Sequence, residues 1–382
     1  MLVERFVAWA ETACADLRAE AVGEFASMYV DAGTSDLDRA ACEKIFTFVM
    51  DDPDPNVRAA MAEALASSKN APAATIWSLV QDIPQVAVPV LKQSPVLCRS
   101  TLIDVVEAGN SSVQEAVASR QNMEGDVART IVSCGSAAAV LALLENRNVV
   151  LGPVLKHEIA ERLGSDAGIR AHLLREDDIR PETRQMLVLQ LSRSLFDMVD
   201  SHDWMETERI RDAANDSANR VTVDIAMSTD GEAMQGYVEH LRSTGQLTPA
   251  LMLRSICAGN ASFFENAIAL LSGASLKRVQ SIVDEGRLSA FKSLYKRTGL
   301  PQSAYGVFAA AISVWQKIGA SELESSTTDA QLCEKAIHGI RERIMQDGGI
   351  DPKLVALVQR LCVEAAKESA RSGEPQLLLT AA

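Results

Sequence analysis

The sequence predicts an all-α protein in which many short helices stack as a solenoid, and three observations lead to this prediction. Apolar residues recur with helical period along most of the chain. One helical unit recurs at nearly constant spacing. Apolar residues make up 47% of the 382 residues but aromatic residues only 4%, which is typical of short Ala-, Leu- and Val-rich helices with closely approaching backbones. The same apolar fraction excludes a disordered chain.

The clearest helix is predicted to begin at Pro55. Its apolar residues fall at i, i+3, i+4, i+7 and i+8, which places them on one helix face. Asp54 is expected to cap this helix, and a proline suits the first helical position, where its missing N–H costs nothing. The apolar positions are Val57, Ala60, Met61, Ala64 and Leu65.

This unit recurs along the first part of the chain. Val57, Val86 and Val113 occupy equivalent positions, at spacings of 29 and then 27 residues. A period in this range with two short helices per unit is typical of a helical solenoid, in which each hairpin buries its apolar face only by stacking. The intervening helices are expected at 76–80, 102–106 and 127–132, with a further one at 137–144.

In the middle of the chain, the sequence predicts one long helix and, further along, a series of short helices. One long helix is expected at 182–199, entered at Pro181, and the charged segment 203–219 is either a boundary or a solvated helix. From Thr248 and Pro249, a second cap-plus-proline start, short helices resume. They are expected at 249–258, 261–272, 275–285, 287–298 and 301–318.

The end of the chain predicts a linker at 319–329 and then two amphipathic helices. The first carries apolar residues from Cys333 to Ile344, and the second opens at Asp351 and Pro352. Two roles stay open for this pair: capping the solenoid, or presenting an apolar stripe to a partner or to a second copy of the chain. The apolar tail 377–382 is either a frayed terminus or, since it resembles bacterial protease-recognition tags, a degradation signal.

The net charge limits the classes of partner that the sequence predicts, and the cysteine content indicates the compartment. The net charge is −14, from 37 basic and 51 acidic residues, which argues against a protein that coats nucleic acid. Glu4 and Glu11 interrupt the N-terminal apolar run, and no window of 18 uncharged apolar residues occurs, so neither a secretory signal nor a membrane span is expected. The seven cysteines are scattered and form no CxxC pair, which favours reduced, buried thiols in the cytoplasm.

Two patterns that bear on metal binding are better explained without a metal. Asp52, Asp54, Asn56 and Glu63 match positions 1, 3, 5 and 12 of a calcium loop, but the sixth position lacks glycine and a helix starts at Pro55, so we expect helix capping. The histidines form no HExxH pair. His157 with Glu161, and His172 with Glu176, are expected to be ordinary i, i+4 surface pairs.

Motifs of catalysis and cofactor binding are absent from the sequence. It holds no GxSxG elbow, Walker loop or GxGxxG fingerprint. We therefore predict no catalytic residue, no cofactor and no metal.

The most informative local feature is a basic segment. Between residues 275 and 300, six basic residues face only Asp284 and Glu285, which gives +4 here and leaves −18 for the rest of the chain. Two interpretations stay open: a solvated face over an apolar stripe that includes Phe291 and Leu294, or a patch for an acidic or phosphate-bearing partner. The candidate partner-binding residues are Lys277, Arg278, Arg287, Lys292, Lys296 and Arg297.

A family resemblance adds to this picture. The run from Asp52 to Leu65 resembles the second-helix signature of HEAT-like repeats, although the later units lose its Val-Arg pair. The run Val90 to Leu97, the helix 113–120, Leu247 to Pro249, Phe263-Phe264 and Gly299 to Pro301 together resemble a bacterial domain family of unknown function, over roughly residues 35 to 318. The resemblance implies HEAT-like helices and a bacterial cytoplasmic setting, and no activity.

With this resemblance, the chain is predicted to hold four parts. They are a HEAT-like region at 1–200, a second helical region at 201–318, the linker at 319–329, and the C-terminal pair with its flexible tail at 330–382.

The predicted function is that of a non-enzymatic interaction scaffold or regulatory adaptor that binds unidentified proteins on its solenoid surface. A homo-oligomer through the C-terminal helices is compatible with this prediction, whereas membrane binding is not expected. One alternative is a regulator that binds nucleic acid or phosphate through residues 277–297, although the acidic body disfavours nucleic acid. Another is a helical-repeat enzyme such as a DNA glycosylase or a lyase, which would need a carboxylate and aromatic residues in a basic groove.

Overall fold

The computed structural model describes residues 2–31, 33–201, 207–229, 231–321, 329–346 and 352–372. Over these ranges it contains 22 α-helices, one short 3-10 helix and no strand, which confirms the predicted all-α class. No helix in the described ranges is long and apolar enough to span a membrane. The chain divides into two compact units, Met1–Arg180 and Pro181–Ala382, which we call unit 1 and unit 2. The domain boundaries inferred from sequence stay predictions.

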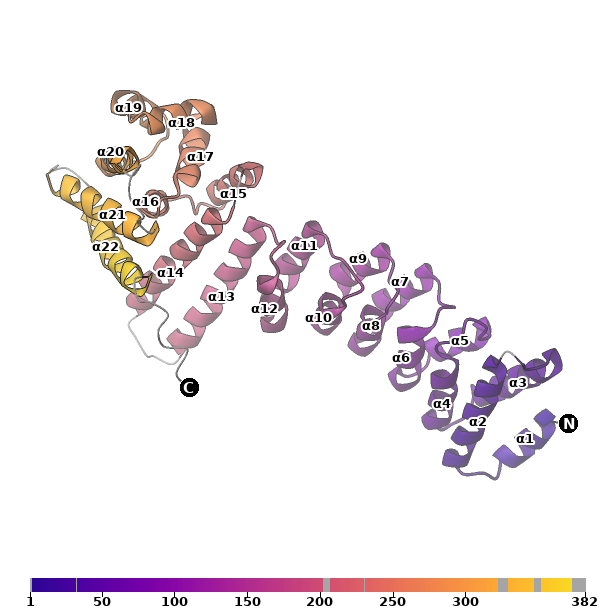
Figure 1. The fold of residues 1–382 in the computed structure, drawn as a ribbon. Helices are drawn as coiled ribbons and strands as arrows, with labels where there is room; N and C mark the ends of the chain where they lie inside the picture. The colour runs from indigo at the N-terminus through magenta and orange to yellow at the C-terminus, as the bar shows by residue number, and fades with distance from the viewer. Residues whose placement is uncertain are drawn as a thin grey trace, which may run out of the picture. The chain divides into compact units, whose positions relative to one another are not determined.

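Unit 1 is built from two rows of short helices (Figure 1). Successive helices of one row pack on each other, and the helices between them form the second row. The first row comprises α2 (Ala15–Val30), α4 (Pro55–Leu65), α6 (Pro84–Gln93), α8 (Ser111–Ala118), α10 (Ala137–Glu145) and α12 (Ala167–Arg175). The second comprises α5 (Ala73–Val80), α7 (Arg99–Ala108), α9 (Gly125–Cys134) and α11 (Pro153–Leu163), while α1 (Leu2–Ala10) and α3 (Asp36–Val49) lie at the N-terminal end.

The recurrence predicted from the sequence is the repeat of the first row. Val57, Val86 and Val113 are buried at equivalent places on α4, α6 and α8. The series continues at Val140 on α10, 27 residues further, and at Ile169 on α12, 29 residues further, and both are fully buried. The two-row stack is thus confirmed, whereas its specifically HEAT-like character stays a prediction.

Capping residues mark where four of the first-row helices, α4, α8, α10 and α12, begin. Asp54 accepts a hydrogen bond from the backbone N–H of Asn56, as predicted. Side-chain oxygens of Asn110, Ser136 and Asp166 do the same at the starts of α8, α10 and α12. These oxygens satisfy N–H groups that have no partner within the helix.

Unit 2 contains the remaining helices around one core. The charged segment is helical where it is described, so of the two predicted alternatives the structure shows the helix. Residues 322–328 of the predicted linker lie outside the described residues, and 319–321 end a helix. The helices are α13 (Pro181–Ser201), α14 (Thr207–Met227), α15 (Gly231–Ser243), α16 (Pro249–Cys257), α17 (Ala261–Ser272), α18 (Leu276–Asp284), α19 (Leu288–Tyr295), α20 (Tyr305–Ser321), α21 (Asp329–Gln346) and α22 (Pro352–Ser372), with η1 at Gln302–Ala304.

The two C-terminal helices pack back onto this core. Ile337 and Ile340 of α21 and Val358 and Leu361 of α22 are buried with residues of α16 and α20. This packing corresponds to the capping alternative, while self-association through the outer faces stays a prediction. The tail 377–382 lies outside the described residues.

A buried polar network joins three helices of unit 2. Gln185 of α13 donates to Thr222 Oγ1 of α14 at 2.8 Å and to Gln246 Oε1 at 3.0 Å. The hydroxyl of Tyr237 on α15 donates to Gln185 Oε1 at 3.0 Å. Tyr237 is fully buried, and burial raises the pKa of its phenol. Such a network fixes one arrangement of the helices because each unmade bond would leave a buried polar group unsatisfied.

We expect Tyr237→Phe to lower the free energy of unfolding by about 1–3 kcal/mol, because it removes a buried donor and leaves Gln185 Oε1 short of a bond. Tyr305→Phe is the matched control, since the Tyr305 hydroxyl makes only an exposed bond of 3.3 Å to the Leu288 carbonyl. Urea unfolding of both variants gives the comparison. Equal losses for the two variants would show that the network does not stabilise unit 2.

Candidate functional site

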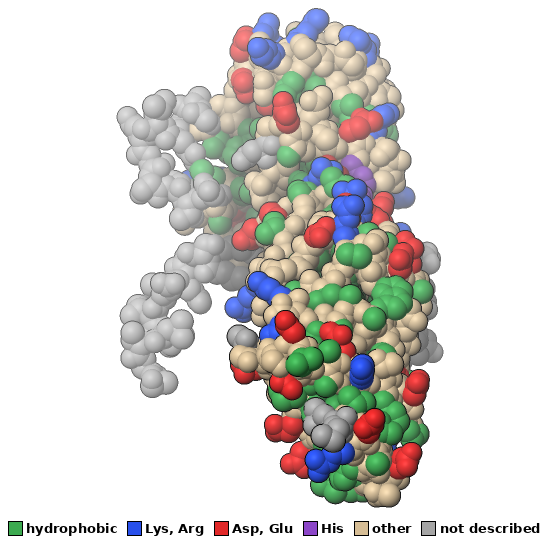
Figure 2. Space-filling view, turned by 90° about the vertical axis from the view of Figure 1, so that its right-hand side faces the viewer, with side chains coloured by type: hydrophobic (Ala, Val, Ile, Leu, Met, Phe, Trp, Pro, Cys, Tyr) green, Lys and Arg blue, Asp and Glu red, His purple; other side chains and the backbone are tan. Residues whose placement is uncertain are grey.

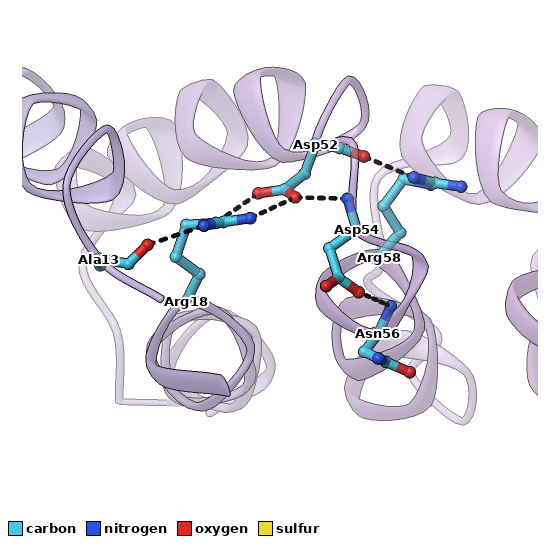
Figure 3. A network of polar contacts seen from close by, with 6 residues as sticks. All are labelled: Ala13, Arg18, Asp52, Asp54, Asn56 and Arg58. Atoms are coloured by element: carbon cyan, nitrogen blue, oxygen red, sulfur yellow. Dashed lines mark hydrogen bonds and ion pairs between the residues drawn. The ribbon is translucent and has the colours of Figure 1, made fainter. Parts of the chain in front are cut away.

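The loop before α4 uses its aspartate oxygens as hydrogen-bond acceptors (Figure 3). The Asp52 carboxylate accepts two bonds of 2.9 Å from the Arg18 guanidinium and one of 2.9 Å from the backbone N–H of Asp54. The Asp54 side chain accepts from the backbone N–H of Asn56 at 2.9 Å. Asp52 and Asp54, two of the residues that resemble a calcium loop, therefore cap α4 and tie it to α2.

Arg58 extends this chain of contacts along unit 1. It donates to the Asp52 carbonyl at 2.5 Å and, through two nitrogens, to the Asp82 carboxylate at 2.5 and 2.9 Å. These bonds from Arg58 hold the pKa of Asp82 below its ordinary value of 3.8, although burial opposes them. Burial also raises the pKa of Asp52, but the bonds from Arg18 and from the Asp54 N–H outweigh it and lower that pKa.

Further along unit 1, side chains bond the last carbonyl groups of helices. Arg120, which is 7% exposed, donates to the carbonyl groups of Leu91 and Ser94 at the end of α6. Asn146 donates to the carbonyls of Ala118 and Arg120 at the end of α8, at 2.9 and 2.7 Å. Arg162 of α11 donates to the carbonyl of Gly135 after α9, at 2.7 Å. The sequence pattern did not assign these contacts, which bridge about 26 to 29 residues.

The histidines make the pairs that their spacing predicts. His157 and His172 each place Nε2 3.5 Å from the glutamate four residues later, so each pair shares a helix face. No group of three or more metal-ligating side chains gathers within the described part of the chain.

The cysteines depart in part from the prediction of buried thiols. Cys42, Cys257 and Cys362 are buried and Cys333 is half-buried, but Cys14, Cys98 and Cys134 are exposed. The prediction is wrong for those three because they lie at helix ends, away from the buried face. Hydrogen bonds with Ser100 and Thr101 lower the pKa of Cys98 to about 7.

All six residues of the predicted basic segment are exposed. Two lie in the first turn of α18, one lies within α19, and three lie in the turns at either end of α19. Phe291, Leu294 and Tyr295 of α19 are buried, which confirms the predicted division between an apolar and a basic face. Figure 2 shows Lys and Arg side chains gathered at the end of unit 2 that carries α18 and α19. We call the exposed side chains of Lys277, Arg278, Arg287, Lys292, Lys296 and Arg297 the basic surface.

Most charges of the basic surface make no ion pair with a described residue. Arg287 pairs with Glu285 at 2.8 Å, whereas the other five make no ion pair with a described residue. Arg297 Nη2 lies 4.0 Å from where a Cβ on Gly273 would stand, so it reaches the turn just before α18. Lys277 and Arg278 occupy the first turn of α18, where the helix dipole disfavours cations. The structure therefore places Arg297, which follows α19, beside the turn that leads into α18 with its two exposed cations.

A second feature of unit 2 could not be found from the sequence. A cavity of about 1000 Å³ is lined by residues of α14, α16, α20, α21 and α22. The buried Arg254 of α16 lies in its wall and donates to Glu364 of α22 at 2.8 Å. These two residues are 110 positions apart, and no local pattern links them.

Comparison with known families assigns most of the chain to one family. A family model described as an uncharacterised protein conserved in bacteria (DUF2336) matches residues 86–348, more than half of the sequence. The match begins later than the resemblance suggested, in α6 rather than near residue 35, and extends beyond residue 318 through α21. Neither a curated protein nor a solved structure matches the chain.

We expect unit 1 to lose stability as the pH falls below about 4, because the pKa values of Asp52 and Asp82 are depressed in the folded state. Their contribution is complete above the unfolded-state pKa and is lost as the pH falls through the folded one. Asp82→Asn should lower the free energy of unfolding at pH 7 by about 1–2 kcal/mol and flatten this acid dependence. Urea unfolding at pH 7 and pH 3 measures both effects.

Asp36→Asn is the control for the Asp82 variant, since it removes the same charge from an exposed side chain on α3. An Asp82→Asn protein with the wild-type acid dependence would contradict the assignment of this ion pair.

Proposed function

The chain belongs to this family of uncharacterised bacterial proteins, and we propose that it is a non-enzymatic interaction scaffold or regulatory adaptor of the cytoplasm. Its partner is an acidic segment of another protein, which binds the basic surface of α18 and α19. The observation that carries the proposal is the set of five exposed cations that make no ion pair with any described residue. An acidic segment supplies the missing counter-charges.

The aromatic core beneath α19 supports this proposal. Phe291 and Tyr295 of α19 stack against Tyr305 and Phe308 of α20 with ring centroids 5.9 to 6.0 Å apart. The hydroxyl of Tyr295 donates to the Pro301 carbonyl at 2.8 Å. Lys292 Nζ lies 5.9 Å from the centre of the Tyr305 ring. The helix that carries the cations is thereby held in place before a partner arrives, which lowers the entropic cost of binding.

The charge distribution favours a protein segment over nucleic acid. The sequence outside residues 275–300 carries a net charge of −18, which repels an extended polyanion such as duplex DNA. A short acidic segment reaches the basic surface without covering the rest of the chain. A cytoplasmic setting suits the buried thiols of Cys42 and Cys257.

We expect a fluorescent 20-residue peptide rich in glutamate to bind the wild-type protein at 50 mM salt and to bind less tightly as salt rises. Lys292→Glu with Lys296→Glu should weaken binding at least tenfold, because two attractions become repulsions. Fluorescence anisotropy with salt titration measures both effects. Duplex DNA of equal charge is titrated in parallel.

Lys44→Glu with Lys69→Glu is the matched control, because it makes the same charge change at exposed lysines of unit 1. It should retain most of the affinity for the peptide. Equal weakening by both double variants would reduce the effect to net charge and contradict a localised site. Tighter binding of DNA than of the peptide would favour the nucleic-acid alternative.

A further inference from the structure

The cavity of unit 2 combines an apolar body with a charged end. Trp315 of α20, Ile337 of α21 and Leu361 of α22 belong to its lining, together with Arg220, Arg254 and Glu364. Its volume of about 1000 Å³ lies at the upper end of the range of small-molecule sites, which typically join apolar walls to a few polar groups.

Arg254 has an unused hydrogen-bonding group in the wall of this cavity. Its side chain is 6% exposed, and Nη1 donates to Glu364 Oε2 at 2.8 Å. Nη2 is buried and has no hydrogen-bond partner among the described residues, since the nearby Asp216 Oδ1 is 3.9 Å away. A buried guanidinium nitrogen without an acceptor is costly, and a rotation of the guanidinium that turns Nη2 toward the cavity would let an acceptor oxygen there remove this cost.

Among the described residues, the charged groups around Arg254 also include one more basic than acidic side chain. Glu364 is shared by Arg254 and by Arg220, which lies 2.9 Å away, and Asp216 pairs with Arg360 at 2.6 Å. Three guanidinium groups thus face two carboxylates. The other charged lining residues are Asp224 and Lys367, one of each sign. One anionic group at this end of the cavity would balance the cluster.

We propose that this cavity binds a small organic anion with an apolar body, its carboxylate or phosphate accepting hydrogen bonds from Arg254 and Arg220. The apolar body lies toward Trp315, whose position is fixed by an indole N–H bond of 2.6 Å to the Ile256 carbonyl. A carboxylate and a phosphate monoester offer the same acceptor chemistry to a guanidinium fork. This site is separate from the basic surface, so neither proposal depends on the other.

The test is isothermal titration of the full chain with four probes that share a ten-carbon tail, all kept below their micelle-forming concentrations. The probes are decanoate, decyl phosphate, decanol and decyltrimethylammonium. Decanoate or decyl phosphate should bind, and whichever is tighter identifies the headgroup. The neutral and cationic probes should bind at least tenfold more weakly. Comparable binding of decanol, or no binding of either anion, would overturn the proposal.

Three variants test whether the ligand binds in the cavity. Arg254→Met should weaken binding of the anion at least tenfold, and Ala365→Phe, which fills the cavity from α22, should abolish it. Lys292→Glu with Lys296→Glu should leave it unchanged. The bound anion should also slow alkylation of Cys333, a half-buried lining residue, measured by mass spectrometry of its peptide.

The Cys333 measurement also covers the case in which Arg254→Met fails to fold, because it uses the wild-type protein. Unchanged alkylation at saturating anion would overturn the proposal, as would full affinity in a folded Arg254→Met protein.

Discussion

The carbonyl groups at the ends of short helices are the constraint on which the structure of unit 1 depends. The last four carbonyls of every helix lack partners within that helix, and helices of 8 to 11 residues have a large share of such groups. Arg120 and Asn146 bond such carbonyls at Leu91 and Ala118, and with Arg162 they also bond carbonyls just beyond the helix ends, from about 26 to 29 residues further along the chain. The same contacts therefore satisfy one helix and fix where the next one stacks.

The arginines that hold the helices of unit 1 together already bond other groups of the chain, so they are not available to a binding partner. Arg18 pairs with Asp52 and Arg58 pairs with Asp82. Arg120 is buried and donates to backbone carbonyls. By contrast, the basic surface of α18 and α19 is exposed, and Arg287 alone of its six residues pairs with a described acidic group. The arginines that stabilise unit 1 therefore have partners within the chain, whereas five cations of the basic surface make no ion pair with a described residue.

Local signals in the sequence predicted the helices between 55 and 144 and most of those after 181, but assigned no helix at 2–49, 153–175 or 231–243. The cap and proline at 54–55 and at 248–249 mark starts that the structure confirms, and the spacing of the buried valines predicts the repeat. Contacts between distant residues were not predictable, because a pattern of residue types does not tell which arginine is buried. Arg254 and Glu364, 110 residues apart, form one ion pair only because α16 and α22 pack together. The exposed thiols were mispredicted for a related reason, since helical period does not locate helix ends accurately.

The central claim is that unit 2 has a preformed basic surface that binds an acidic protein segment. Amide hydrogen exchange with and without the glutamate-rich peptide tests it most directly, because it reports where the peptide lies. We expect slower exchange in peptides covering 276–300 and unchanged exchange in unit 1. Slower exchange confined to unit 1, or to α21 and α22, with none in 276–300, would contradict the account.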